Sequence, residues 1–210
     1  VQKHLHELEG TRFESLPMLA CVGNHEYQKG VRRTLPAIWQ QTFRMPTNGP
    51  LDFQGSTYFV DFPAMRVIAI NTTGLQSLRD YTRVYTWLKR TMQTRQQGQF
   101  SVVIMHHPVY SVAKGRYNVF INLFFRRLLN RADIVFCGHD HTYARHLPYI
   151  ELVSVERPHA IKPALAAEKV IENEPIYSLL SAKQDTLVVR SYLMRNDSLV
   201  DEVVLTKDSL

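Results

Sequence analysis

The sequence predicts an α/β protein, on three observations. Apolar runs rich in β-branched and aromatic residues alternate along the chain with stretches of helical periodicity. Several of these runs are almost continuously hydrophobic, which is typical of strands covered on both faces of a sheet. The 210 residues, 45% of them hydrophobic, are enough for one sizeable domain with an ordinary packed core.

Five apolar runs are the candidate strands, and two periodic stretches between them are the candidate helices. Each helical stretch has apolar residues recurring on one face, so we expect both helices to pack on the sheet with their aromatic side chains in the core. The strands are expected at 16–22, 57–62, 65–71, 100–105 and 133–137. The helical faces are Val84, Trp87, Leu88 and Met92 in the first helix, and Phe120, Leu123, Phe124 and Leu128 in the second.

The chain changes character after Pro148. Residues 151–175 mix prolines, charges and one Ala-rich patch, which predicts an extended connection with a short helix near 163–171. Regular alternation then returns over 186–206, as two runs joined through Asn196-Asp197, a pair typical of a hairpin turn.

Overall composition excludes few functions. The formal net charge of +6 comes from basic residues spread along the chain, which favours a solvated surface over specific nucleic-acid binding. Cys21 and Cys137 are too few for a disulfide framework, and each lies in an apolar run, so we interpret both as small buried side chains. No apolar run approaches the roughly 18 residues of a membrane span.

Three segments share one pattern, in which an apolar run leads directly into a polar cluster. They read "MLACVGNHEY" (18–27), "SVVIMHHPVY" (101–110) and "DIVFCGHDHTY" (133–143). In open α/β sheets, functional sites gather beyond the carboxyl ends of the strands, where loops bring distant segments together. The three clusters are therefore candidates for one site.

The side chains in these clusters favour a metal. Neutral imidazoles with an amide or carboxylate oxygen form the mixed nitrogen and oxygen set that binds Zn, Fe or Mn. Asn24, His106, His139 and His141 offer such a set. In an extended "GHDH" segment both imidazoles would face one cavity, while Asp140 would point aside.

The same clusters carry a family resemblance. "GNHE" at 23–26, "MHHPVYS" at 105–111 and "GHDHTYAR" at 138–145 resemble the last three conserved blocks of the calcineurin-like metallophosphoesterase superfamily. The HxP form of the middle block and the Tyr-x-Arg after GHxH are most similar to the purple acid phosphatase branch. The resemblance covers about residues 16 to 146, with the blocks in the family's order.

The resemblance implies an α/β fold of α+β type, a four-layer αββα sandwich of two mixed sheets flanked by helices. Residues 1–150 would be the C-terminal portion of the catalytic domain. Residues 151–175 would be a connection, and 176–210 would complete the second sheet with a strand and the hairpin.

The resemblance also implies the roles of five residues. Asn24, His106 and His139 would bind one metal and His141 the other, in a binuclear centre with ions of Fe, Zn or Mn. His106 matches the ligand position because it stands two residues before the proline. His25 would lie near the substrate phosphate, as a proton donor or as a stabiliser of the oxyanion.

Further donors to the substrate phosphate are not placed by the sequence. His107 lies beside the matched ligand, and Tyr143 and Arg145 follow the GHxH block, so these three are candidate substrate-binding residues. Arg116 is another cation that could contact substrate.

The function implied is metal-dependent hydrolysis of phosphorylated small molecules, by a metal-activated water attacking in line, as in an acid phosphatase. A phosphodiesterase of the same superfamily and a degenerate, non-catalytic binding module are the alternatives. The purple acid phosphatase resemblance leans towards an extracytoplasmic location.

Two earlier blocks of the superfamily, DxH and GD, are absent from the sequence. They would supply the remaining ligands of the second metal and the bridging carboxylate, so one metal site is incomplete in these residues. Because Val1 is no natural start, we expect a C-terminal portion of a longer phosphoesterase. An N-terminal segment or another chain would then cover the exposed sheet.

Overall fold

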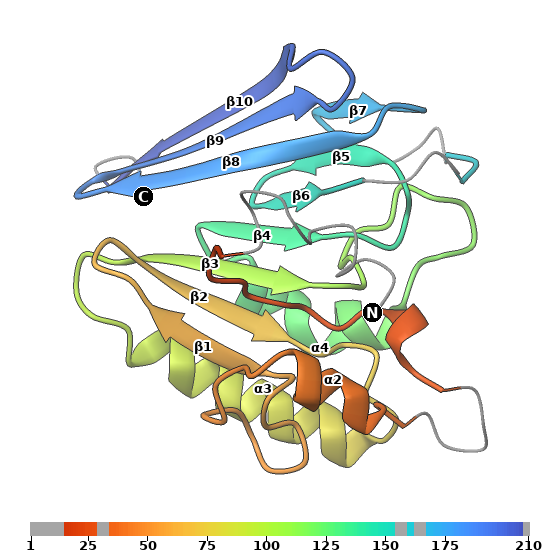
Figure 1. Ribbon diagram of the computed structural model, residues 1–210, viewed down its shortest axis with the longest axis vertical. Helices are drawn as coiled ribbons and strands as arrows, with labels where there is room; N and C mark the ends of the chain where they lie inside the picture. The colour runs from red at the N-terminus through yellow and green to blue at the C-terminus, as the bar shows by residue number, and fades with distance from the viewer. Residues whose placement is uncertain (1–14, 29–33, 154–158, 162–166, 208–210) are drawn as a thin grey trace.

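The computed structural model describes residues 15–28, 34–153, 159–161 and 167–207. It contains a seven-stranded mixed sheet and a three-stranded antiparallel sheet (Figure 1). The strands of the first sheet are β1 (Tyr58–Asp61), β2 (Met65–Ile70), β3 (Phe100–Met105), β4 (Ile134–Cys137), β5 (Tyr143–His146), β6 (Tyr149–Glu151) and β7 (Lys169–Ile171). Those of the second are β8 (Ile176–Lys183), β9 (Thr186–Leu193) and β10 (Leu199–Thr206). The helices are η1 (Asn24–Glu26), α2 (Ala37–Thr42), α3 (Leu78–Gln93) and α4 (Val119–Leu129).

The first sheet has the strand order β1-β2-β3-β4-β6-β5-β7. Neighbouring strands from β2 through β3 and β4 to β6 run parallel, and the outer pairs are antiparallel. Four of the five predicted strands are confirmed here, at β1 to β4. The parallel arrangement brings the carboxyl ends of β2, β3 and β4 to one edge of the sheet.

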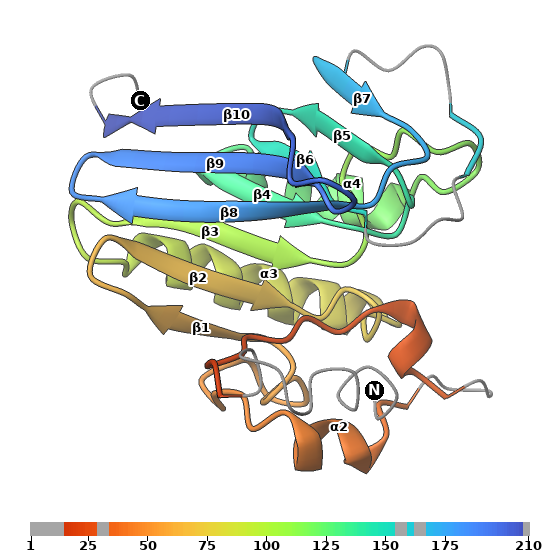
Figure 2. The ribbon, with the colours of Figure 1, turned by 45° about the horizontal axis from the view of Figure 1, so that its top comes forward.

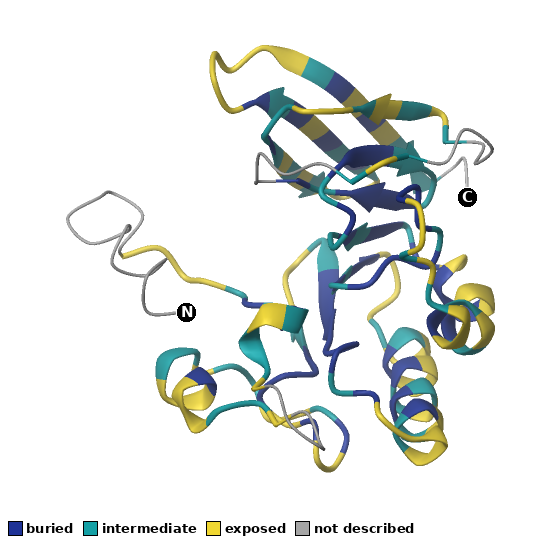
Figure 3. Cartoon of the chain, turned by 90° about the vertical axis from the view of Figure 1, so that its right-hand side faces the viewer, coloured by how far each residue is buried: buried dark blue, intermediate teal, exposed yellow. Residues whose placement is uncertain are grey.

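Two apolar cores hold the layers together. One lies between α3, α4 and one face of the first sheet, and it contains Ile68, Leu88 and Phe125. The other lies between the opposite face and the second sheet, where Ile134 and Leu187 are fully buried. Figure 3 shows the first sheet largely dark blue, between the helices and the second sheet, with yellow outer faces on the helices. The predicted α/β class is confirmed, and the described layers are helices, first sheet and second sheet.

The helix α3 begins where its sequence provides a capping box. Ser77 Oγ accepts from the backbone N–H of Asp80, and the Asp80 carboxylate accepts from that of Ser77. Val84 and Leu88 on the predicted face are fully buried, while Trp87 and Met92 are half-buried against the same core.

The predicted face of α4 is only partly confirmed, because Leu128 is buried and Phe124 is half-buried against the core, whereas the other two residues are exposed. Phe120 and Leu123 are 52% and 71% exposed, and the buried side chains are Ile121, Phe125, Leu128 and Leu129. Since "VFINLFF" is apolar almost all round, its periodicity favours no single face, and contact with the sheet selects one.

The predicted strand at 16–22 is wrong. The described residues from 17 to 23 have no regular secondary structure and pair with no strand of either described sheet. Their backbone bonds to side chains instead: the Ala20 carbonyl accepts from the Tyr58 hydroxyl at 2.9 Å, and the Ala20 N–H points at Met45 Sδ. An apolar run fits a covered coil as well as a strand.

The short helix expected near 163–171 is contradicted at its end, where Lys169–Ile171 forms β7 and pairs antiparallel with β5. The backbone N–H of Glu168 donates to the Arg145 carbonyl, so the edge of the sheet overrides the helical propensity of this segment. Residues 162–166 of that prediction lie outside the described residues.

The predicted hairpin is confirmed. Strands β9 and β10 pair antiparallel around a turn at Asn196-Asp197, in which Asp197 has a φ of 56°. Figure 2 shows β9 in the middle of the second sheet, between β10 and β8. The sheet is antiparallel, where a mixed one was expected. No helix in the described part of the chain is long and apolar enough to cross a membrane.

Candidate metal centre

The ends of β3 and β4 carry the centre of the candidate site. His106 and His107 follow directly after β3, and His139 follows β4 by two residues. The backbone N–H of Gly138 donates to the His106 carbonyl at 3.0 Å, which joins the two strand ends. The parallel pairing of the two strands therefore determines that these histidines meet.

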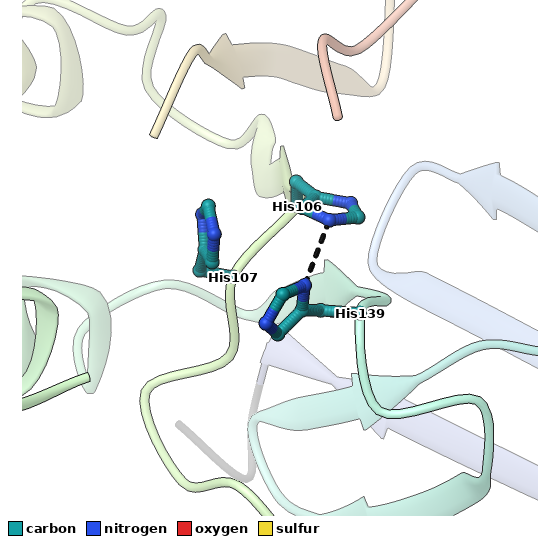
Figure 4. Close-up of side chains that lie close together, drawn as sticks. All are labelled: His106, His107 and His139. Carbon is teal, nitrogen blue, oxygen red and sulfur yellow. Dashed lines mark hydrogen bonds between the residues drawn. The ribbon is translucent and has the colours of Figure 1, made fainter. Parts of the chain in front are cut away.

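His106, His107 and His139 form a compact cluster (Figure 4). One ring nitrogen from each lies within 4.8 Å of the others. His106 Nε2 is 2.9 Å from His139 Nδ1, and on its other side it is 2.7 Å from Asn24 Oδ1. An amide oxygen and two imidazole nitrogens thus converge from three distant parts of the sequence.

Asn24 reaches the cluster from η1, which lies close against His106. A Cβ atom at Gly23 would lie 3.1 Å from His106 Nδ1 and 2.8 Å from the Glu26 carboxylate. The Gly23 N–H donates to that carboxylate at 2.7 Å. Since the φ of Gly23 is −98°, the glycine is required here for space and not for an unusual backbone angle.

The environment of His106 and His139 keeps both imidazoles neutral. Burial is the largest cause, and the charges of His107, Arg116 and His141 act in the same direction on both rings. Together they lower the pKa of His106 to about 3 and that of His139 to about 2. Neutral imidazole is the form that binds metals.

His107 is oriented by a residue that the sequence analysis missed. Thr72 follows β2, and its Oγ1 lies 2.9 Å from His107 Nδ1 and accepts from the His107 backbone N–H at 3.2 Å. The sequence did hold a signal, because "MRVIAINTT" repeats the pattern of an apolar run ending in polar residues. The carboxyl end of a third parallel strand therefore supports the site.

The segment "GHDH" is not extended, contrary to expectation. His139 and His141 have φ angles of 75° and 56°, so the alternation of a strand does not apply to them. His141 stacks on His159 with ring centroids 4.6 Å apart, and it is not a member of the three-histidine cluster. His159 was not identified from sequence, where it lies in the irregular connection.

Asp140 points away from the cluster and is fully buried. Its Oδ2 accepts from Ser111 Oγ at 2.6 Å and from the Ala113 N–H at 3.1 Å. Its Oδ1 lies 3.6 Å from Arg116 Nε. Burial and the neighbouring Asp140 raise the pKa of Glu151 well above its usual value, so Glu151 is the neutral partner of a buried carboxyl pair.

The remaining predicted site residues lie in two different environments. His25 is exposed on η1, next to Asn24. Tyr143 and Arg145 instead face the second sheet, where both donate to Asp201, at 2.9 and 2.7 Å. Arg116, by contrast, reaches the histidines, and its Nη2 lies 2.9 Å from His139 Nδ1.

The donor set fits a metal ion. Bonds of about 2.1 Å, typical of imidazole and carbonyl ligands, place neighbouring ligand atoms of one ion roughly 3 Å apart. The separations of 2.7 and 2.9 Å along Asn24, His106 and His139 are of this size. Nitrogen with amide oxygen suits Zn, Fe or Mn.

A family model decides the relationship. The model described as calcineurin-like phosphoesterase matches residues 3–143, about two thirds of the chain. The chain belongs to the calcineurin-like phosphoesterase family. All three sequence blocks of the candidate site begin within the matched part of this calcineurin-like chain.

Relatives of this family member include purple acid phosphatases. Purple acid phosphatase 21 of Arabidopsis thaliana is 29% identical over 153 residues, and the match covers 69% of this chain and 33% of that protein. The structure of purple acid phosphatase PPD1 from yellow lupin (Lupinus luteus) matches 91% of this chain and 41% of its own, with 14% identity and a TM-score of 0.62. GAP50, described as the anchor in the inner membrane complex of Plasmodium, matches 71% of this chain and 53% of its own, with 15% identity and a TM-score of 0.57.

The two structural neighbours show that the calcineurin-like chain shares their fold. The chain spans about a third of the length of the curated relative and about half or less of these two structures.

Proposed function

We propose that this protein hydrolyses phosphate monoesters at a binuclear metal centre, as an acid phosphatase does. The observation that carries the proposal is the convergence of Asn24 Oδ1, His106 Nε2 and His139 Nδ1 within 2.7 and 2.9 Å. Family membership and similarity to purple acid phosphatases support metal-dependent chemistry on a phosphoester.

In this proposal Asn24, His106 and His139 hold one metal ion, and His141 contributes to the second. When bound, the two ions would neutralise phosphate charge and lower the pKa of a bound water towards 7. The protein's own contribution is to present neutral ligands in a fixed arrangement. This arrangement depends on strand β3, on the hydrogen bond from the Gly138 N–H to the His106 carbonyl, and on the close approach of Gly23 to His106.

His25 is proposed as the proton donor to the leaving alcohol. It is exposed and follows Asn24 directly, so a substrate near the metal ligands can reach its ring. Replacement by alanine is expected to lower kcat by roughly 10²- to 10⁴-fold, the usual contribution of general acid catalysis. Metal content, measured by elemental analysis, should remain at the wild-type value. Wild-type turnover in His25→Ala would exclude this role.

The test of the function as a whole is metal analysis followed by kinetics. The purified protein is expected to contain about two Fe, Zn or Mn ions per chain, and a chelator should abolish its hydrolysis of p-nitrophenyl phosphate. Faster hydrolysis of bis(p-nitrophenyl) phosphate would favour a phosphodiesterase. Finding neither metal nor turnover would instead support a non-catalytic module.

A further inference from the structure

Arg116 is the cation that the fold brings to the candidate metal centre. It lies in the loop between β3 and α4, and its Nη2 is 2.9 Å from Nδ1 of His139. Its charge also acts on His106, across the cluster. Within the described part of the chain, the other groups whose charge lowers the pKa of His106 or His139 are all imidazoles, those of His25, His107, His141 and of the pair itself. Arg116 is the one permanently charged group among them.

A buried carboxylate forms an ion pair with this arginine on the side away from the histidines. Asp140 Oδ1 lies 3.6 Å from Arg116 Nε, while Asp140 Oδ2 accepts from the side chain of Ser111 and the backbone of Ala113. Asp140 is fully buried, and the side chain of Arg116 is 24% exposed. The Nε edge of the guanidinium therefore faces the protein interior, and the Nη end faces the histidines.

The loop that carries Arg116 is held on its other side too. Ala113 forms a bridge with Ile161, and the Lys114 N–H donates to the Ala160 carbonyl at 2.7 Å. The backbone of the Arg116 loop is thus held by packing. A metal ion on His139 Nδ1 would take the place of the contact with Arg116 Nη2, and that end of the guanidinium would then be available to a phosphate group. A planar, permanently charged group held in this way is suited to bidentate recognition of phosphate oxygens.

We propose that Arg116, positioned by Asp140, recognises the phosphate group and gives the site its preference for phosphomonoesters over phosphodiesters. The inference rests on the proposed function, because it assigns the substrate class of that same site. A monoester is a dianion with three free oxygens, so two can bind the guanidinium while the third faces the metal site. A diester has one charge and a second ester group in place of one such oxygen.

The test compares Arg116→Met and Arg116→Lys with Lys114→Ala in the purified, metal-loaded protein. Lys114 is exposed in the same loop, so its replacement removes an equal charge without touching the histidines. Calorimetry measures the affinity for inorganic phosphate, and kinetics measure kcat/KM for p-nitrophenyl phosphate and for bis(p-nitrophenyl) phosphate. Elemental analysis reports the metal content of each variant.

In Arg116→Met we expect phosphate affinity and kcat/KM for the monoester to fall about 10- to 100-fold, as on loss of a charged hydrogen bond. The kcat/KM for the diester should fall much less in this variant. Lys114→Ala should resemble the wild type in phosphate affinity and in kcat/KM for both esters. Arg116→Lys keeps a charge beside Asp140 but loses the planar fork, so it should show a smaller loss in the same direction.

Unchanged phosphate affinity in Arg116→Met, or equal losses for the two esters, would overturn the inference. If the methionine variant does not fold, Arg116→Lys decides: wild-type phosphate affinity and ester preference in that variant would overturn it as well. If the proposed function is wrong, the wild-type protein will hydrolyse neither ester. Its affinity for phosphate can still be compared with that of the variants, so the two failures are distinguishable.

Discussion

Two polar clusters lie only a few residues apart in "GHDHTYAR", and they are built in opposite ways. In the histidine cluster, ligand atoms face one another: His106 Nε2 lies between Asn24 Oδ1 and His139 Nδ1. In the cluster between the sheets, which we call the junction, donors face an acceptor. Tyr143 and Arg145 donate to Asp201, and Lys169 lies 3.6 Å from the same carboxylate.

The difference separates the arrangement that we propose as functional from a structural one. In the junction, donors from β5 and β7 surround the one carboxylate, and Ser191 of β9 lies 3.0 Å from the Tyr143 hydroxyl, so the cluster joins the two sheets. The histidine cluster brings together three atoms that can each bind a cation, from Asn24, His106 and His139. Substitutions in the first cluster should therefore affect metal binding and catalysis, and those in the second should affect folding stability.

The largest expected effect belongs to His106→Ala. It removes the central ligand atom of the histidine cluster, so metal affinity and kcat/KM should each fall by at least about 100-fold. Thermal stability of the metal-free protein should change little, because the hydrogen bonds of this imidazole within the described residues are to Asn24 and His139 of the same site. Elemental analysis, kinetics and thermal melting of metal-free protein measure the three quantities. Strong destabilisation of the metal-free variant would contradict the comparison.

Asp201→Ala should have the opposite profile. The Asp201 side chain is 6% exposed, and its removal leaves Arg145 and Lys169 without their shared carboxylate. Because Arg145 keeps some contact with solvent and a second partner in Glu168, we expect a loss of about 2–4 kcal/mol in the free energy of unfolding. Urea denaturation measures this loss.

The matched control is Glu202→Ala, on the next position of β10. Glu202 pairs with Arg190 on the exposed side of the second sheet, so its replacement should change stability by less than about 1 kcal/mol. Equal losses in the two variants would show that burial of the junction carboxylate is unimportant. Folded Asp201→Ala protein should keep its metal.

The smallest effect is on the pH dependence of stability. Burial raises the pKa of Asp201, but hydrogen bonds from Arg145 and Tyr143, with the charges of Arg145 and Lys169, outweigh it and leave the pKa lowered. A lowered folded-state pKa stabilises the protein above the unfolded value of about 3.9, and this stabilisation is lost as the pH falls towards the folded value.

Asp201→Asn should therefore lose less stability than the wild type between about pH 5 and the acid limit. Urea titrations at a series of pH values compare the two slopes. Parallel curves would mean that Asp201 does not titrate differently in the folded and unfolded protein.

The sequence alone determined the α/β class, strands β1 to β4 and the β9–β10 hairpin, because local periodicity and turn residues specify them. It also determined which residue types could hold a metal, since histidine and asparagine side chains follow apolar runs at 24, 106 and 139. These features depend on neighbours in sequence.

Only the tertiary structure decided the buried face of α4, the coil at 16–22 and the partners of each polar side chain. His139 and His141 have left-handed φ angles in place of the extended backbone expected, and His141 is not a member of the three-histidine cluster. Packing of the second sheet turns Arg145 towards Asp201, and the loop fixed by Asp140 turns Arg116 towards His139. Such choices depend on contacts between distant segments, which local sequence patterns do not encode.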